Sequence, residues 1–236
     1  MVREKGFTLI ELLVVVAVIA LLLSMMAPIM PRIFALVEKD TCQSNLHQLG
    51  IAHSAYLAEY RNRFVPFRWW IAGGYTDIAA LANPAQSRIY PYVQNARFFL
   101  CPTFRKVCAP NAVRSYVMQH SFGDTEGWYN GAAWGNGYSI DSVVQVKDPS
   151  RLCIVTEEAT WMVHVGDTWY SRYAVNDAHL VTPDWPNRDT IAQFHYPGPG
   201  PIDQQIEGVG NVDFVDGHVA PVVTTQTPYV ISQNWY

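Results

Sequence analysis

A nearly uninterrupted apolar run close to the N-terminus constrains this chain more than any other feature. Twenty residues from Leu12 to Pro31 carry no charge, and as a helix they would be about 30 Å long, the thickness of the hydrocarbon core of a bilayer. One acidic residue, Glu11, stands at the start of the run. Because a carboxylate costs about 2.5–3.5 kcal/mol to insert into lipid, it is expected to have a partner. The run is therefore either a plain membrane anchor or a helix that packs against copies of itself.

The residues before the apolar run form a short hydrophilic leader. Its two basic residues, Arg3 and Lys5, favour a cytoplasmic location for the N-terminus. A secretory signal peptide has its small-residue cleavage site after the apolar region, whereas the small residue here, Gly6, precedes it. Cleavage between Gly6 and Phe7 would remove the leader and leave the apolar helix on the mature protein.

This arrangement, a basic leader followed by GFTLIELLVV, resembles the type IV prepilin and type II secretion pseudopilin family. The resemblance implies cleavage after Gly6 by a prepilin peptidase and N-methylation of the new Phe7 amine. It also implies that Glu11 pairs with the Phe7 amine of a neighbouring subunit during assembly. The expected partners are copies of this chain or related pilins. In such a filament, Pro28 and Pro31 would let the helix bend or stretch.

Helical periodicity continues past the apolar run. Apolar and aromatic residues recur at steps of three and four, which predicts one buried helical face: Ile33, Val37, Leu46, Leu49, His53, Tyr56, Leu57 and Tyr60. Asn45 belongs to the polar residues of the other face, and Pro28 and Pro31 interrupt the helix. We therefore expect a leader at 1–6, a long helix at 7–60 with 7–31 as membrane span and filament core, and a globular domain at 61–236.

Short β-prone segments separated by long loops follow the helix. Residues 114–122 have strand character, 143–150 look like a strand end and a turn, and 151–157 are the strongest candidate for a central strand. In residues 210–221, Asp216 and Gly217 predict a hairpin with a two-residue turn. The expected class is α+β, a type IV pilin-like fold in which the long helix packs on a small antiparallel sheet.

The order of motifs in the second half of the chain gives another resemblance. The series PYV, FFLCP, SYVMQ, DPSRLCIVTEE, FH and NVDFVDGHV resembles a group of prepilin-like proteins of planctomycetes whose C-terminal domain ends in an H-X9-D-G motif. The matching residues are His195, Asp216 and Gly217. In this chain twenty residues separate the histidine from the aspartate, and the stretch PGPGPIDQQIEG looks like the insertion responsible.

Charge and cysteine content limit the functions that the chain can have. The formal net charge of −4 becomes −5 after cleavage, because the leader carries two basic residues and one acidic residue; this does not suggest nucleic-acid binding, which requires a basic patch. An exported domain can oxidise its cysteines, here Cys42, Cys101, Cys108 and Cys153. Cys101 and Cys108, close in sequence around Pro102, are the expected disulfide pair. Free buried thiols are the alternative.

Several titratable residues near the C-terminus could in principle form a metal or acid–base site: Glu157, Glu158, His195, Asp216 and His218. Their spacing matches no compact metal motif, and the chain has no G-x-S-x-G nucleophile motif. We therefore expect structural roles, with Asp216 in a turn, His218 starting the return strand and His195 hydrogen-bonded to a backbone group. The chain is expected to be neither an enzyme nor a cofactor protein.

Calcium is the one ion that the resemblance to pseudopilins suggests, since some of them hold it near the C-terminal sheet. Its oxygen ligands would come from Asp213, Asp216 or Glu157.

Two functional hypotheses follow from the sequence. The first is a structural subunit of a type IV pilus-like filament or a type II secretion pseudopilus. Before assembly it would be a single-pass inner-membrane protein with its C-terminal domain in the periplasm, and afterwards part of an extracellular filament or pseudopilus. The second is a membrane-tethered surface binding module for glycan or protein that uses the prepilin leader for export. Eight tryptophans, all from Trp69 onward, could stack on sugars or form a protein interface. We expect most of these tryptophans in the core and a minority at an interface.

Overall fold

The computed structural model describes the side chains of most of the first half of the chain and of the sheet. The described ranges are 7–71, 77–106, 111–119, 121–123, 139–157, 191–192, 195 and 209–223, with backbone alone for 107, 164–165, 168–169 and 179–180. The leader at 1–6, with Gly6, lies outside them, as does Cys108. The chain divides into two units, Met1–Val37 and Glu38–Tyr236.

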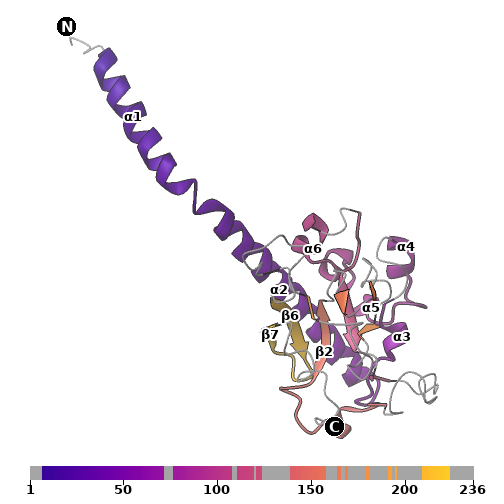
Figure 1. Ribbon diagram of the computed structural model, residues 1–236. Coiled ribbons are helices and arrows are strands. Elements are labelled where there is room, and N and C mark those ends of the chain that lie inside the picture. Colours follow the sequence, from indigo (N-terminus) through magenta and orange to yellow (C-terminus); the bar gives the residue numbers. More distant parts are fainter. Residues whose placement is uncertain are drawn as a thin grey trace. The chain divides into compact units, whose positions relative to one another are not determined.

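The N-terminal region is helical on both sides of a short break. Helix α1 covers Leu9–Met26 and α2 covers Met30–Glu59, with a turn at residues 27–29 (Figure 1). Pro28 lies in that turn and Pro31 is the second residue of α2. Neither proline can donate to the carbonyl four residues before it, so a continuous helix loses two bonds here. In α2, Pro31 stands where an N–H would have no intrahelical partner.

Helix α1 is apolar on every side. None of its residues is buried, and Glu11 is its only charged residue. Within the described ranges, this is the one helix long and apolar enough to cross a membrane. A helix that is hydrophobic all round belongs inside protein or lipid, so α1 fits membrane anchoring.

The C-terminal unit is built on a sheet whose strand order is β5-β1-β2-β6-β7. Its strands are β1 (Tyr116–Gln119), β2 (Cys153–Glu157), β5 (His179–Leu180), β6 (Val209–Phe214) and β7 (Val219–Val223). Strands β1, β2, β6 and β7 form a four-stranded antiparallel array, and β5 pairs parallel to β1. A separate antiparallel pair joins β3 (His164–Val165) to β4 (Thr168–Trp169). The α+β class and its consistency with a pilin-like fold are confirmed, as is the central position of strand 151–157.

Short helices connect these elements. They are α3 (Phe67–Trp70), α4 (Ile78–Leu81), α5 (Tyr90–Val93), η1 (Ala96–Phe99), α6 (Pro102–Val107) and η2 (Val143–Gln145). The prediction of a strand end in 143–150 is wrong, because η2 is a 3₁₀ turn. Ser142 and Gln145 form a capping box around it, in which the Ser142 N–H donates to Gln145 Oε1 at 2.8 Å, and this satisfies the backbone locally.

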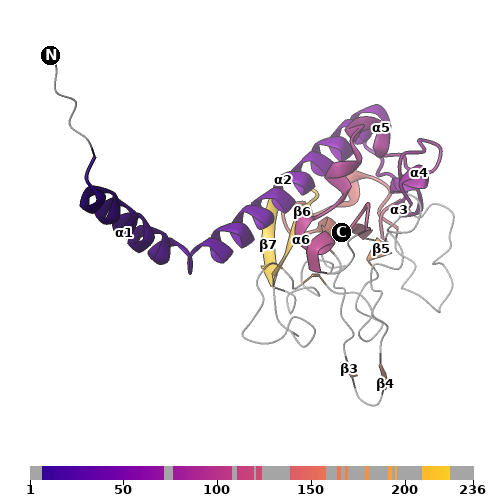
Figure 2. The ribbon, with the colours of Figure 1, turned by 90° about the horizontal axis from the view of Figure 1, so that it is seen from above.

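From Glu38 onward, α2 packs against one face of the sheet (Figures 1 and 2). The predicted helical face is confirmed for Leu46, Leu49, His53 and Tyr56, all of which are buried. It is wrong at its two ends, since three of its members are exposed: Ile33, Val37 and Tyr60. The prediction that Asn45 belongs to the polar face is also wrong, because Asn45 is buried. Its side-chain amide donates to the Leu100 carbonyl at 3.0 Å, which satisfies the polar group inside the protein.

Two of the eight tryptophans have described side chains, and one of these lies in the core. Trp70 is fully buried and stacks on His53, with ring centroids 6.1 Å apart. Trp69 is partly buried beneath the Arg88 guanidinium, which lies 5.8 Å from the ring centroid. The side chains of the other six tryptophans lie outside the described residues.

The predicted hairpin joins β6 to β7, but its turn is one residue longer than expected. Phe214 N–H donates to the His218 carbonyl at 3.0 Å and Gly217 N–H donates to the Phe214 carbonyl at 2.8 Å. Three residues, Val215 to Gly217, therefore form the loop. Gly217 has φ +85°, which glycine adopts without steric cost, and a glycine at this position is typical of three-residue hairpin loops.

At one contact between α2 and the sheet, the carboxyl group of Asp213 lies against the backbone of Gly50. A Cβ at Gly50 would lie 2.8 Å from Asp213 Oδ1, so only glycine lets α2 approach this closely. Among the described residues, neither carboxyl oxygen of Asp213 has a hydrogen-bond partner. Burial, and secondarily the Asp216 charge, raise the pKa of Asp213 well above its ordinary value, because an unpaired charge is costly away from water.

Replacing Asp213 with Asn is expected to stabilise the protein at pH 7. The folded chain must keep this carboxyl protonated while the unfolded chain releases the proton above about pH 4, so the wild type loses stability as the pH rises toward the raised pKa. The stability gap between variant and wild type should widen by up to about 1.4 kcal/mol per pH unit. Urea denaturation of the full chain in detergent between pH 4 and 7 measures this. Asp40→Asn, on the exposed side of α2, is the control, and parallel curves for Asp213→Asn and wild type would refute the assignment.

Candidate functional site

Two groups of polar side chains are candidates for a functional site. The first lies at the start of α1. Thr8 is the N-cap of α1, and its N–H and Oγ1 both donate to Glu11 Oε2 at 2.8 Å. The Glu11 N–H in turn donates to Thr8 Oγ1 at 3.3 Å. This reciprocal arrangement is a capping box, which satisfies donors at the helix start that have no intrahelical acceptor.

The capping box fixes the Glu11 carboxylate beside the predicted cleavage site. Phe7, the predicted new N-terminal residue, directly precedes Thr8 and is 75% exposed. Glu11 Oε2 is engaged with Thr8, and within the described residues the second oxygen, Oε1, has no hydrogen-bond partner. The carboxylate is therefore held in one orientation by Oε2, and Oε1 remains as a further hydrogen-bond acceptor.

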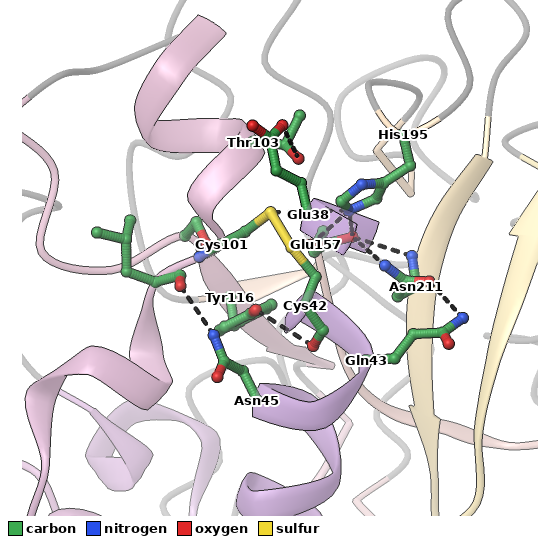
Figure 3. The surroundings of a disulfide bond; sticks show 12 residues. Glu38, Cys42, Gln43, Asn45, Cys101, Thr103, Tyr116, Glu157, His195 and Asn211 are labelled. Atoms are coloured by element: carbon green, nitrogen blue, oxygen red, sulfur yellow. Dashed lines mark hydrogen bonds and ion pairs between the residues drawn. A yellow bond between two sulfur atoms is a disulfide. The ribbon is translucent and has the colours of Figure 1, made fainter. Parts of the chain in front are cut away.

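The second group is a buried polar cluster around a disulfide that the sequence did not predict. The bond joins Cys42 on α2 to Cys101, just before α6, with the Cα atoms 5.1 Å apart (Figure 3). The predicted pair Cys101–Cys108 is wrong, because the Cys101 sulfur is bonded to Cys42. The Cys101 N–H donates to Ser115 Oγ at 2.8 Å, which fixes the residue against the chain that leads into β1.

The disulfide closes a loop of the chain between α2 and α6. Its two cysteines are separated by 59 positions, so sequence proximity gave no indication of the pairing. A polar link runs beside it, in which Lys106 of α6 contacts the Glu38 carboxylate of α2 at 3.0 Å. The free cysteine of the described part, Cys153, is buried. Its burial, and then the Asp213 carboxyl, raise the pKa of the thiol well above its ordinary value, so the thiol is unreactive.

A histidine–glutamate pair lies against the disulfide (Figure 3). His195 Nε2 lies 2.7 and 2.9 Å from the two carboxyl oxygens of Glu157, and 3.7 Å from the Cys101 sulfur. Both side chains of the pair are fully inaccessible to solvent. The expectation that His195 is hydrogen-bonded to a backbone group holds for its own N–H, which donates to the Val209 carbonyl at 3.3 Å, whereas its side chain contacts the Glu157 carboxyl group.

Asn211 of β6 donates two further hydrogen bonds to Glu157. Its backbone N–H and its side-chain amide donate to Glu157 Oε2 at 3.0 and 3.3 Å. Gln43 of α2 donates to Asn211 Oδ1 at 3.0 Å, which ties this part of the cluster to the helix. The buried carboxyl group thus has several hydrogen-bond donors, as a buried polar group requires.

Tyr116 of β1 borders the same cluster and bonds the helix backbone. Its hydroxyl donates to the Cys42 carbonyl at 3.4 Å. Burial, and secondarily the Glu157 charge, raise the pKa of Tyr116 well above its ordinary value. The phenol is therefore a neutral hydrogen-bond donor at physiological pH.

The residues that match the H-X9-D-G motif are not brought together. Among the described residues no hydrogen bond or ion pair joins His195 to Asp216, whose carboxylate instead accepts from His218 Nδ1 and from the His218 N–H. Asp216 and Gly217 lie in the three-residue hairpin loop, and His218 directly precedes β7. The predicted position of Asp216 in a turn is therefore confirmed, whereas the return strand begins one residue after His218.

The calcium ligands suggested by resemblance do not form a group in the described part of the chain. Asp213 faces Gly50, Asp216 lies in the turn and Glu157 is bonded to nitrogen donors. The set of metal-capable side chains that does converge there is Cys42, Cys101, Glu157 and His195, whose ligand atoms all lie within 4.8 Å of one another. The sequence had suggested Glu157 and His195 as possible neighbours, but it missed Cys42 and Asn211.

A partial signal for Cys42 was present in the helical pattern. Cys42, Leu46 and Leu49 follow one another at steps of four and three, so the cysteine extends the buried face of α2. Nothing comparable marked Asn211, because a polar residue within a strand is normally read as facing solvent.

Comparison with known proteins places the N-terminal site in a defined class. Residues 1–27 match the family model of the prokaryotic N-terminal methylation motif, the signature of prepilin-like proteins. The motif indicates export and assembly of the type IV pilin or pseudopilin kind, with processing by a peptidase. The match ends before the globular unit and does not bear on His195, Asp216 or Gly217. No curated protein and no solved structure matched the chain significantly.

Tryptic mapping without reduction should show the Cys42–Cys101 bond. Cleavage after Arg105 and Lys106 separates Cys101, in peptide 98–105, from Cys108, in peptide 107–114. We expect peptide 98–105 linked to peptide 40–61. A link between 98–105 and 107–114 would contradict the structure. Removing both cysteines with Cys42→Ala and Cys101→Ala should lower the free energy of unfolding by about 2–4 kcal/mol, more than the control Cys153→Ala, which also removes one buried sulfur.

Proposed function

We propose that this chain is a structural subunit of a type IV pilus-like filament or a type II secretion pseudopilus. The observation that carries the proposal is the Thr8–Glu11 capping box at the start of an exposed, wholly apolar helix, within the matched methylation motif. A plain anchor requires only apolar length. A contact surface between subunits would in addition use a carboxylate held in one orientation at the edge of the membrane span, as Thr8 holds Glu11.

The exposed surface of α1 supplies the force for assembly. Every residue of α1 is exposed in the single chain. The helix is therefore stable in the bilayer, and outside the bilayer it is stable only when it packs against other apolar surfaces. Apolar surface left in water costs about 25 cal/mol per Å². A helix that leaves the membrane must therefore pack against other α1 helices, and these would form the filament core.

Glu11 would set the register between neighbouring subunits. Cleavage after Gly6 creates a positively charged amine at Phe7, which stays cationic after N-methylation. The amine of one subunit would donate to Glu11 Oε1 of its neighbour, while Thr8 holds Oε2 of the same carboxylate. Such a pair in apolar surroundings is costly to break, since removing one partner leaves an unpaired charge.

The C-terminal unit would provide the surface contacts of the filament rather than catalysis. The described titratable groups support a non-enzymatic role: Glu157 and His195 are closed off from solvent, and Asp216 and His218 serve a turn. Before assembly the protein would be a single-pass inner-membrane protein, with Arg3 and Lys5 in the cytoplasm and the sheet domain in the periplasm.

Mass spectrometry of the mature N-terminus tests the processing step. When the full chain is expressed with a prepilin peptidase, the N-terminal residue should be Phe7 carrying an added methyl group. Expression without the peptidase is the control and should leave Met1 and the leader in place. An intact leader on assembled protein would refute the proposed processing.

Replacing Glu11 with Ala is expected to reduce filament yield at least about tenfold, since about 1.4 kcal/mol lost per contact suffices for that. The C-terminal unit should stay folded, with unchanged urea stability. Glu11→Gln should fail similarly, because it keeps the shape and loses the charge. Ser24→Ala is the matched control, since the Ser24 hydroxyl bonds the Leu21 carbonyl of its own helix. Normal filament yield from Glu11→Ala would overturn the role of Glu11.

A further inference from the structure

We propose that, when the Cys42–Cys101 bond is reduced, the two thiolates together with Glu157 and His195 bind one Zn²⁺. The four side chains come from different parts of the fold: α2, the residue before α6, the end of β2 and the segment before β6. Their ligand atoms nevertheless all lie within 4.8 Å of one another. The fold therefore assembles four donors around one point (Figure 3).

The donor set suits zinc better than calcium or magnesium. Two sulfurs, one imidazole nitrogen and one carboxylate oxygen are ligands that Zn²⁺ accepts, and four donors match its tetrahedral geometry. Calcium and magnesium prefer oxygen ligands alone, in larger numbers. Thiolate ligands in particular select soft or borderline metals.

The spacing of the donors is close to that of a tetrahedral zinc site. Zinc–ligand bonds of about 2.0–2.3 Å place neighbouring donor atoms about 3.3–3.8 Å apart. The Cys101 sulfur already lies 3.7 Å from His195 Nε2. The contact of His195 with the Glu157 carboxyl, at 2.7–2.9 Å, is a hydrogen bond that would open by about half an ångström to admit the ion.

Neighbouring groups hold the ligands in place. Asn211 donates twice to Glu157 Oε2, so Oε1 is the oxygen positioned to ligate the ion. Ser115 fixes the backbone of Cys101, and the Tyr116 hydroxyl bonds the Cys42 carbonyl. Such outer contacts orient metal ligands and raise affinity.

The site would be structural, because it is closed to solvent. Cys42, Cys101 and Glu157 are fully buried and His195 is 5% exposed. Four protein ligands leave no open position for a substrate or water, as in structural zinc sites. The ion would enter while the chain folds, before the two sulfurs are oxidised.

Disulfide and zinc are mutually exclusive at this site. A dithiol reductant supplies two electrons and two protons, which break the S–S bond and give two thiols, and the reductant becomes a disulfide. Zinc binding then releases the two thiol protons. In the reverse direction, a disulfide oxidant takes two electrons from the thiolates, the S–S bond forms and the ion leaves. Both the disulfide and the zinc ion would cross-link α2 to the chain before α6. The zinc ion would in addition link them to the sheet through Glu157 of β2.

Refolding with metal tests the proposal on the full chain in detergent. The chain is reduced in urea with a phosphine, freed of reductant and refolded without oxygen in the presence of Zn²⁺. After dialysis we expect about one zinc per chain, and none in protein refolded with the disulfide intact. Refolding with Co²⁺ should give the visible absorption of tetrahedral cobalt bound to thiolates. Reduced wild-type chain that retains no metal would overturn the proposal.

Variants distinguish this site from the other cysteines. His195→Ala and Glu157→Gln should each weaken zinc binding at least about tenfold and change the cobalt spectrum. Cys153→Ala and Cys108→Ala are the controls and should bind as wild type does. Loss of binding in a control, or unchanged spectra in both ligand variants, would place the metal elsewhere. The spectra of Cys153→Ala and Cys108→Ala, which keep all four proposed ligands, decide the question even if a ligand variant fails to fold.

Discussion

The fit of α2 against one face of the sheet is the interaction on which the rest of the C-terminal unit depends. Leu46 and Leu49 supply the apolar part of this contact, and Gly50 lets the helix backbone come down onto Asp213. The disulfide fixes the same helix to the chain before α6. The helix that organises this core follows α1 in the sequence, after the turn at residues 27–29.

This close fit has an electrostatic cost. Asp213 is buried without a hydrogen-bond partner among the described residues, and its burial raises the pKa of the carboxyl group, which favours the neutral form. Glu157, one strand away, shows the opposite solution, since histidine and asparagine donors surround it. A buried carboxyl is tolerated either by protonation or by hydrogen bonds, and this sheet uses both.

Glu11 in the N-terminal unit and Glu157 in the C-terminal unit are carboxylates in opposite environments. At Glu11 the carboxylate is exposed in the single chain and held by Thr8, which suits a group that awaits a partner. At Glu157 the carboxylate is buried and already fully partnered within the subunit. In the proposed assembly the first arrangement would serve contacts between chains, whereas the second lies wholly within one chain.

The sequence by itself determined the features that depend on neighbouring residues. The apolar run with Glu11, the break at Pro28 and Pro31, the central strand at 151–157 and the hairpin at Asp216-Gly217 all arise from local periodicity or turn chemistry. Only the tertiary structure decided which distant groups meet: Cys42 with Cys101, Glu157 with His195 and Asn211, and Gly50 with Asp213. These pairings depend on how α2 lies on the sheet, a relation that no local pattern of residues encodes.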